Sequence, residues 1–233
     1  MKTIPLADRI LFEDNHLIIV NKLPGELVQG DKTGDVPLSE SLKTFIKKRN
    51  NKPGNVFLGV PHRLDRPVGG AIIFAKTSKA LSRLSDMFRR KTIDKTYWAI
   101  TENKPAASQA ELVGYLSKNE SKNKSFVSDV EKGGHKEARL SYTYLKGSDR
   151  YHLLEIDLHT GRHHQIRAQL ANMGCIIKGD LKYGAARSNP DGSISLHARR
   201  LKFEHPVKQT PLDLTAPCPD DKLWAFFEGS ENS

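Results

Sequence analysis

The segment 56–75 constrains the fold of this 233-residue chain more than any other. It predicts an apolar strand over residues 56–60, a polar loop, and then two glycines that release the backbone into a second apolar strand. The loop holds a single carboxylate, Asp65, between Arg63 and Arg66. The pattern therefore predicts an acidic side chain displayed where a strand ends.

Asp65 has two readings from the residues alone. A lone aspartate in a loop is commonly a turn former or the partner in a surface ion pair. Strand ends are also where folds place reactive groups, and a carboxylate between two guanidinium groups stays ionised, as a nucleophile must. The residues alone leave both readings open.

Several motifs point to a known family when they are taken together. The run HRLD at 62–65 is followed by KTYWA at 95–99, TGRHHQIR at 160–167 and GDLKYG at 179–184. In this order and approximate spacing they resemble the RluA-type pseudouridine synthases. The opening over 10–25 resembles that family's ILYEDDDLLVVNKPAG, and the ending LHARRLKFEHP resembles its last motif, so the likeness covers nearly the full length.

The chain departs from the family pattern at three places. Val68-Gly69-Gly70 stands where the family usually has Thr-Ser-Gly, His163 where it has Thr, and Gln169 where it has His. The S4 domain that precedes the catalytic part in some relatives is not expected here.

The resemblance implies a fold and an activity. The fold is α+β, with a largely antiparallel mixed central sheet, flanking helices and a central catalytic cleft. We expect one catalytic domain over 1–233, built of two lobes that share the cleft. The implied activity is the isomerisation of uridine to pseudouridine in structured RNA, ribosomal or transfer, by base flipping and with no metal or cofactor.

The resemblance also assigns catalytic residues. Asp65 would act as nucleophile or as base, Tyr97 would stack on the target uracil, and Arg167 would keep the Asp65 carboxylate ionised and oriented. The ordinary alternatives are that Tyr97 is strand packing and that Arg167 is a cation on a helix surface.

Three further residues are candidates for binding the substrate. Arg63 would fill the gap that the extruded uridine leaves in a stem, whereas the alternative is a structural pair with Asp65. His62 and Gln165 belong to the same motifs, and Gln165 would shape the cleft or contact phosphate.

The charge of the chain favours a polyanionic partner. Lys and Arg outnumber Asp and Glu by 37 to 27, which gives a formal charge of +10. A merely soluble basic protein is the alternative. The residues Met1 to Leu6 lack the apolar run of a signal peptide, and no apolar run could span a bilayer, so we expect a cytoplasmic protein. We also expect it to be a monomer. Cys175 and Cys218 form no C-x-x-C pair and are expected to be small core residues.

A metal site is weighed and rejected. His159, His163 and His164 have spacings that could gather imidazoles, but Gly161 interrupts the helix, and no carboxylate or cysteine lies at ligand spacing.

Two rival functions remain at this stage. A nucleosidase would need a second acid beside Asp65, and none stands out. A non-catalytic RNA-binding protein would keep the charge and could dispense with Asp65.

The hydrophobic periodicity predicts the remaining elements. They are a hairpin over 9–21, a helix after Pro37, a helix capped by Thr77 or Ser78, a strand over 95–100, strands over 138–145 and 151–159, a helix start over 160–170, a strand and loop over 175–184, a strand over 212–214 and a helix around 223–227. Residues 118–128 and 131–136 predict a polar, mobile excursion.

Overall fold

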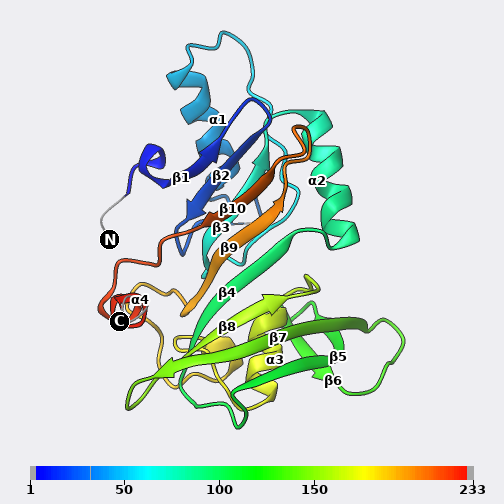
Figure 1. Ribbon diagram of the computed structural model, residues 1–233, viewed down its shortest axis with the longest axis vertical. Helices are drawn as coiled ribbons and strands as arrows, with labels where there is room; N and C mark the ends of the chain where they lie inside the picture. Colours follow the sequence, from blue (N-terminus) through cyan, green and yellow to red (C-terminus); the bar gives the residue numbers. More distant parts are fainter. Residues whose placement is uncertain (1–3, 32, 230–233) are drawn as a thin grey trace. The chain divides into compact units, whose positions relative to one another are not determined.

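A computed structural model describes residues 4–31 and 33–229 of the chain, which form two compact units. The first unit extends to Ile93 and includes Ala198–Pro219, and the second comprises Asp94–His197 and the residues from Asp220 on. Each unit combines antiparallel strands with helices (Figure 1). The predicted α+β class is confirmed. Residues 1–3 of the segment examined for a signal peptide lie outside the described residues.

The first unit is built on a hairpin and the strand beside it. Strand β1 (Ile10–Glu13) pairs with β2 (Leu17–Lys22), and the intervening turn is fixed by Asp14, whose Oδ1 accepts from the backbone N–H groups of residues 16 and 17. Strand β3 (Gly69–Ala75) pairs antiparallel with β2. Because β2 and β3 are almost continuous apolar runs, both of their faces are buried. The predicted hairpin and exit strand are confirmed.

The strand predicted over residues 56–60 is wrong. Only Gly59 pairs, through an isolated bridge to Ala75. The strand order places β3 between β2 and β9 (Leu196–Glu204), so β3 already has a neighbouring strand on each side. The apolar run therefore pairs with β3 only where Gly59 meets Ala75, the last residue of that strand.

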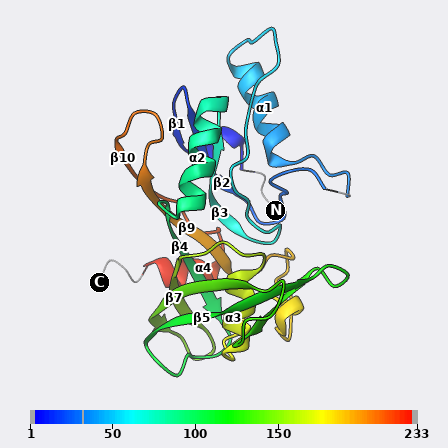
Figure 2. The same ribbon diagram turned by 90° about the vertical axis from the view of Figure 1, so that its right-hand side faces the viewer.

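Two helices complete this unit, together with β10 (Pro211–Thr215), which pairs with β9. Helix α1 (Leu38–Arg49) follows Pro37 as predicted. Helix α2 (Ser78–Arg90) begins at Thr77, whose Oγ1 accepts from the Ala80 N–H. The apolar stripe of α2 packs on β2, β3 and β9, along which the helix lies in Figure 2. No helix in the described part of the chain is long and apolar enough to cross a membrane.

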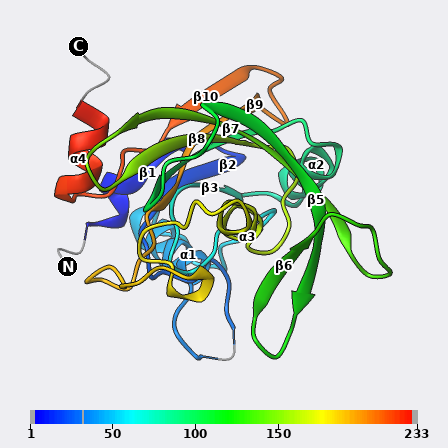
Figure 3. The same ribbon diagram turned by 90° about the horizontal axis from the view of Figure 1, so that it is seen from below.

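The second unit is an antiparallel sheet wrapped past one helix. Its strand order is β4 (Asp94–Thr101), β8 (His152–Leu158), β7 (Lys136–Gly147), β5 (Gln109–Asn119) and β6 (Lys124–Ser128). Helix α3 (Gln165–Asn172) is seen end-on in Figure 3, with the strands curving past it. The second unit also contains α4 (Lys222–Glu228). The predicted strand pair over 138–159 and the last helix are confirmed.

Two predictions for this unit were wrong, and the predicted helix with Ile166 and Leu170 inside is confirmed with a later start. Residues 118–128 form the β5–β6 hairpin instead of an irregular excursion, and the hydroxyl of Tyr183 bonds both the N–H and the C=O of Ser125 on β6. The segment 175–184 forms a bridge at Ile177 and a 3-10 turn at Leu181–Tyr183 instead of a strand. Helix α3 begins only at Gln165, because the preceding residue has a left-handed φ of 52°.

The two cysteines are free thiols. Cys175 is buried in the second unit as expected, but Cys218 is only half-buried. Their different exposure shows that the prediction of two core cysteines was half right.

A buried lysine holds the loop that carries Asp65. The side chain of Lys22 is fully buried, and its Nζ donates to the carbonyls of Leu23 (3.0 Å), Arg66 (3.1 Å) and Val68 (2.6 Å). Three acceptors match the three donors of an ammonium group. Burial lowers the pKa of Lys22 to about 7, and the negative charge of Asp65 is among the groups that oppose this effect.

Gly70, at the start of β3, is fixed by its surroundings. Its φ is +116°, and a Cβ there would lie 2.4 Å from the carbonyl oxygen of Ala198 and 2.5 Å from its nitrogen. Both atoms are backbone, so no side-chain movement could relieve the contact. Only glycine fits this position. Gly70 is also the one residue of Val68-Gly69-Gly70 that matches the Thr-Ser-Gly of the family pattern.

Gly70→Ala is therefore expected to lower the free energy of unfolding by at least about 2 kcal/mol, the sum of left-handed strain and a backbone clash. Urea denaturation of purified protein measures this. Gly54→Ala is the control, since Gly54 has open space around its Cβ position. Equal effects of the two substitutions would contradict a backbone clash at Gly70.

Lys22→Met is expected to lower the free energy of unfolding by about 2–4 kcal/mol at neutral pH, because three carbonyls lose their donor. Lys47→Met, at an exposed position of α1, is the matched control and should change the value little.

The cost of Lys22→Met is also expected to depend on pH. Between pH 7 and 10 the unfolded chain keeps Lys22 protonated while the folded chain releases the proton, so folded stability rises with pH; below pH 7 this dependence disappears. The difference between wild type and variant should grow by about 2 kcal/mol from pH 6.5 to pH 9. Urea titrations across this range check it, and a constant difference would contradict a lowered pKa.

Candidate active site

The Asp65 loop is anchored at both ends within the first unit. At its start, His62 accepts the backbone N–H of Ile73 at Nε2 (3.0 Å), and its ring stacks on Phe88 at 4.5 Å between centroids. At its end the Val68 N–H donates to the Asp65 carbonyl (3.0 Å). The Asp65 residue itself is half-buried. The candidate carboxylate thus stands on a braced loop, and His62 has a bracing role.

Two charged residues of the first unit add to the description of the Asp65 loop. Arg66 donates to Asp35 (2.7 Å) and to the carbonyl of Gly25 (3.0 Å). Lys22 is a buried cation whose charge interacts with Asp65, and sequence reasoning missed it. Arg63 is exposed. The sequence did contain a sign of this burial. Lys22 lies at the end of a strand that is otherwise mostly apolar, and lysines are seldom fully buried.

Tyr97 lies on β4 in the second unit. It pairs with Ile156 of β8 and is 8% exposed. The neighbouring Trp98 points to the other face, where its Nε1 donates to Glu155 (3.1 Å). The predicted alternation of this strand is confirmed.

Arg167 forms a buried ion pair within the second unit. Its Nε and Nη2 donate to the two carboxylate oxygens of Asp180 at 2.7 and 2.8 Å, and the two side chains are 5% and 1% exposed. The guanidinium also lies over the ring of Tyr183, 5.1 Å from its centroid. The alternative of a helix-surface cation was wrong. Asp180 and Tyr183, which lie in the GDLKYG segment, were not assigned roles from the sequence.

The side chain of Gln165 makes three hydrogen bonds within the protein. Its Oε1 accepts from the Thr160 hydroxyl (2.8 Å) and the Arg162 N–H (3.0 Å), and its Nε2 donates to the Arg139 carbonyl (3.1 Å). This buried amide ties the start of α3 to β7. We therefore do not carry its predicted contact with substrate into the proposal below.

The two histidines beside Arg167 contact each other and Tyr183. His163 and His164 stack at 3.8 Å between centroids, and His164 Nδ1 lies 3.1 Å from the Tyr183 hydroxyl. Burial, followed by the nearby charge of Arg167, lowers the pKa of His164 to about 2, so this ring stays neutral. No cluster of three metal-ligating side chains occurs among the residues described.

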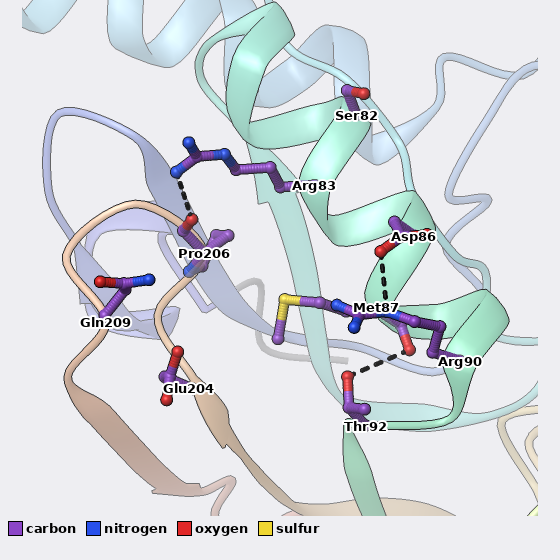
Figure 4. Close-up of a pocket in the computed structure, with 9 residues that line it drawn as sticks. All are labelled: Ser82, Arg83, Asp86, Met87, Arg90, Thr92, Glu204, Pro206 and Gln209. Carbon is purple, nitrogen blue, oxygen red and sulfur yellow. Dashed lines mark hydrogen bonds and ion pairs between the residues drawn. The ribbon is translucent and has the colours of Figure 1, made fainter.

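A separate groove of about 490 Å³ lies between α2 and the β9–β10 turn of the first unit (Figure 4). Its lining consists of Ser82, Arg83, Asp86, Met87, Arg90, Thr92, Glu204, Pro206 and Gln209. Two arginines face two carboxylates, and Arg83 is already bonded to the Pro206 carbonyl (2.7 Å). The lining is electrically balanced and includes none of the candidate residues, so we do not assign the groove to the active site.

The chain is similar to known RNA-modifying proteins. The family model described as RNA pseudouridylate synthase matches residues 16–172. An uncharacterized RNA pseudouridine synthase of Bacillus subtilis is 32% identical over 91% of this chain and 69% of its own length. The ribosomal large subunit pseudouridine synthase C of Vibrio vulnificus is 31% identical over 93% of this chain and 67% of its own length.

A solved structure supports the fold. Human RNA pseudouridylate synthase domain containing 4 superposes with a TM-score of 0.78 at 23% identity, over 95% of this chain and 93% of that one. The family model spans most of the chain, and the relatives exceed 30% identity over more than nine-tenths of it. The chain belongs to the RNA pseudouridine synthase family, whose members are isomerases that act on RNA.

Proposed function

We propose that Asp65 is the catalytic group of this synthase and that Tyr97 and Arg167 complete its active site. The observation that carries the assignment is the bracing of the Asp65 loop by Lys22 and His62, which fixes one carboxylate without burying it completely. A positioned carboxylate is what the reaction needs, because a small misplacement of a reacting group costs a large factor in rate.

The chemistry requires one such group. The N-glycosidic bond of uridine breaks, the uracil turns while it is held, and its C5 bonds to C1′ of the ribose. Asp65 would either attack the sugar or abstract a proton from it, and we leave this choice open. Tyr97 would offer a ring face to the flipped base, a contact worth about 1–3 kcal/mol.

Arg167 would act as the charge partner of the Asp65 carboxylate. A guanidinium carries five N–H donors, so its capacity exceeds the two bonds to Asp180. The buried pair fixes the plane of the guanidinium, which makes Asp180 a positioning residue in this proposal. The predicted single catalytic domain, with a cleft between its lobes, is kept as part of the proposal.

The proposed substrate is RNA of the large ribosomal subunit. Curated relatives from Vibrio and Rickettsia are named ribosomal large subunit pseudouridine synthase C, and the net charge of +10 suits a polyanion. Transfer RNA is the second candidate kept from the sequence. We place the reaction in the cytoplasm and propose that a single copy of the chain, without metal or cofactor, performs it.

Asp65→Asn is expected to reduce pseudouridine formation more than about a hundredfold, which corresponds to roughly 2.7 kcal/mol of barrier. The substitution is isosteric, so fold and RNA affinity should change little. The measurement is mapping of pseudouridine in ribosomal RNA from cells that lack the gene, after incubation with each protein.

Asp213→Asn, an exposed position on β10, is the matched control and should retain full activity. Turnover above about a hundredth of wild type would remove Asp65 from the central role. Release of free uracil by wild type would instead favour a nucleosidase, and binding without any product would favour a non-catalytic RNA-binding protein.

Arg63→Ala is expected to slow the reaction most when the target uridine is stacked in a stem. If Arg63 fills the vacated place in the stem, its loss matters only where flipping costs a few kcal/mol. Single-turnover rates on a structured RNA and on an unstructured oligonucleotide of the same sequence measure the difference. Equal losses on both would leave Arg63 as a charge partner of Asp65.

A further inference from the structure

The β5–β6 hairpin of the second unit has two different faces. One face packs on α3 and on the 3-10 turn Leu181–Tyr183: Leu116 and Val127 belong to or contact the cluster of Ala138, Ala168 and Tyr183. Side chains alternate along a strand, so the neighbours of these residues point to the opposite face. That face carries Phe126 and its cross-strand partner Ser117.

Phe126 is exposed although an apolar cluster lies on the other side of the same strand. Its exposed fraction is 43%, whereas Tyr115, two residues from Ser117 on β5, is half-buried on the same face. Diagonal neighbours on one face of a sheet lie within reach of each other's rings. Exposed aromatic rings on a sheet are the usual platform for unpaired bases, because every base has a stacking face.

One lysine lies beside this ring, and others occur in and near the hairpin turn. The Nζ of Lys124 lies 5.6 Å from the centroid of Phe126 and 4.8 Å from that of Tyr183. Lys182 donates to the carbonyls of Lys122 (3.4 Å) and Asn123 (3.1 Å) in the hairpin turn. Residues 115–128 contain three lysines and one carboxylate, Glu120, which is paired with Lys118 (2.7 Å). The charge suits phosphate groups on either side of a stacked base.

The edge of this hairpin is poorly suited to pairing with a strand of another chain. Strand β6 is the last in the sheet order, and such an edge ordinarily invites another strand. The Tyr183 hydroxyl, however, accepts the Ser125 N–H (2.9 Å) and donates to its carbonyl (3.2 Å). The middle of the edge is therefore closed to pairing by another chain.

We propose that the face of the β5–β6 hairpin centred on Phe126 and Lys124 binds an unpaired segment of the substrate RNA, with one base stacked on Phe126. The proposal deepens the proposed function, because it takes RNA as the substrate, but it does not depend on the assignment of Asp65.

The test compares the binding of two labelled probes by fluorescence anisotropy at fixed salt. The probes are a 20-nucleotide uridine oligomer and a blunt RNA duplex of 20 base pairs. Phe126→Ala is expected to weaken binding of the oligomer about tenfold and that of the duplex by less than about twofold. Phe126→Trp should restore binding of the oligomer, because a ring is present again.

Phe226→Ala is the matched control, since Phe226 is also an exposed phenylalanine of this unit, at 52%. It should bind both probes like wild type. Lys124→Gln should weaken both probes modestly and lower the slope of log affinity against log salt by about one. Thermal unfolding of each variant reports whether it folds, and ultraviolet crosslinking of the oligomer to wild type should modify Phe126.

Three outcomes would overturn the proposal. Equal binding of the oligomer by wild type and Phe126→Ala would exclude stacking, and equal losses on both probes would indicate readout of the backbone alone. A wild-type dimer that Phe126→Ala dissociates in sedimentation would assign the face to a second copy. Because none of these measurements needs turnover, they can succeed or fail independently of pseudouridine formation.

Discussion

The buried ion pair between Arg167 and Asp180 is the interaction on which the polar centre of the second unit depends. Both side chains have lost nearly all contact with water, so each charge is stabilised by the other. The bidentate geometry fixes the guanidinium plane and joins α3 to the turn that follows it. Breaking a buried ion pair by removing one partner typically costs about 3–5 kcal/mol. Residues that use the position of Arg167 therefore depend on Asp180 as well.

The first unit also contains a buried cation, but this cation is stabilised by different groups. Lys22 is as deeply buried as Arg167, but its ammonium is met by three backbone carbonyls instead of a carboxylate. Two of these carbonyls belong to the segment that carries Asp65, so the cation ties β2 to the candidate loop. A buried cation thus fixes the candidate loop in the first unit, whereas in the second unit the buried cation is itself the candidate and is held by Asp180. In both units stability and positioning depend on the same contacts.

Sequence reasoning could find the periodic elements and the motifs, but not these buried partners. The hairpin at Asp14 and the helix capped by Thr77 follow from local patterns, and the structure contains both. Lys22 and Asp180 have their roles because the fold brings other groups into contact with them. The local pattern of apolar and polar residues does not contain this information. The strand expected over 56–60 failed for the same kind of reason, since the two neighbours of β3 are chosen by the whole sheet. The hairpin over 118–128 was predicted as an irregular excursion because its residues are mostly polar. Its second strand is stabilised by the Tyr183 hydroxyl, which is distant in sequence.

That tyrosine links the two functional features of the second unit. The ring of Tyr183 lies under the guanidinium of Arg167, and its hydroxyl holds β6 at Ser125. The strand that exposes Phe126 and the helix that carries Arg167 are therefore fastened to the same side chain, without a flexible connection between them. An exposed aromatic ring on an edge strand is ordinarily an aggregation hazard, which proteins reduce by blocking the edge. Here the edge is blocked by the hydroxyl while the ring stays accessible, an arrangement that protects the strand from other chains and leaves its face open to a base.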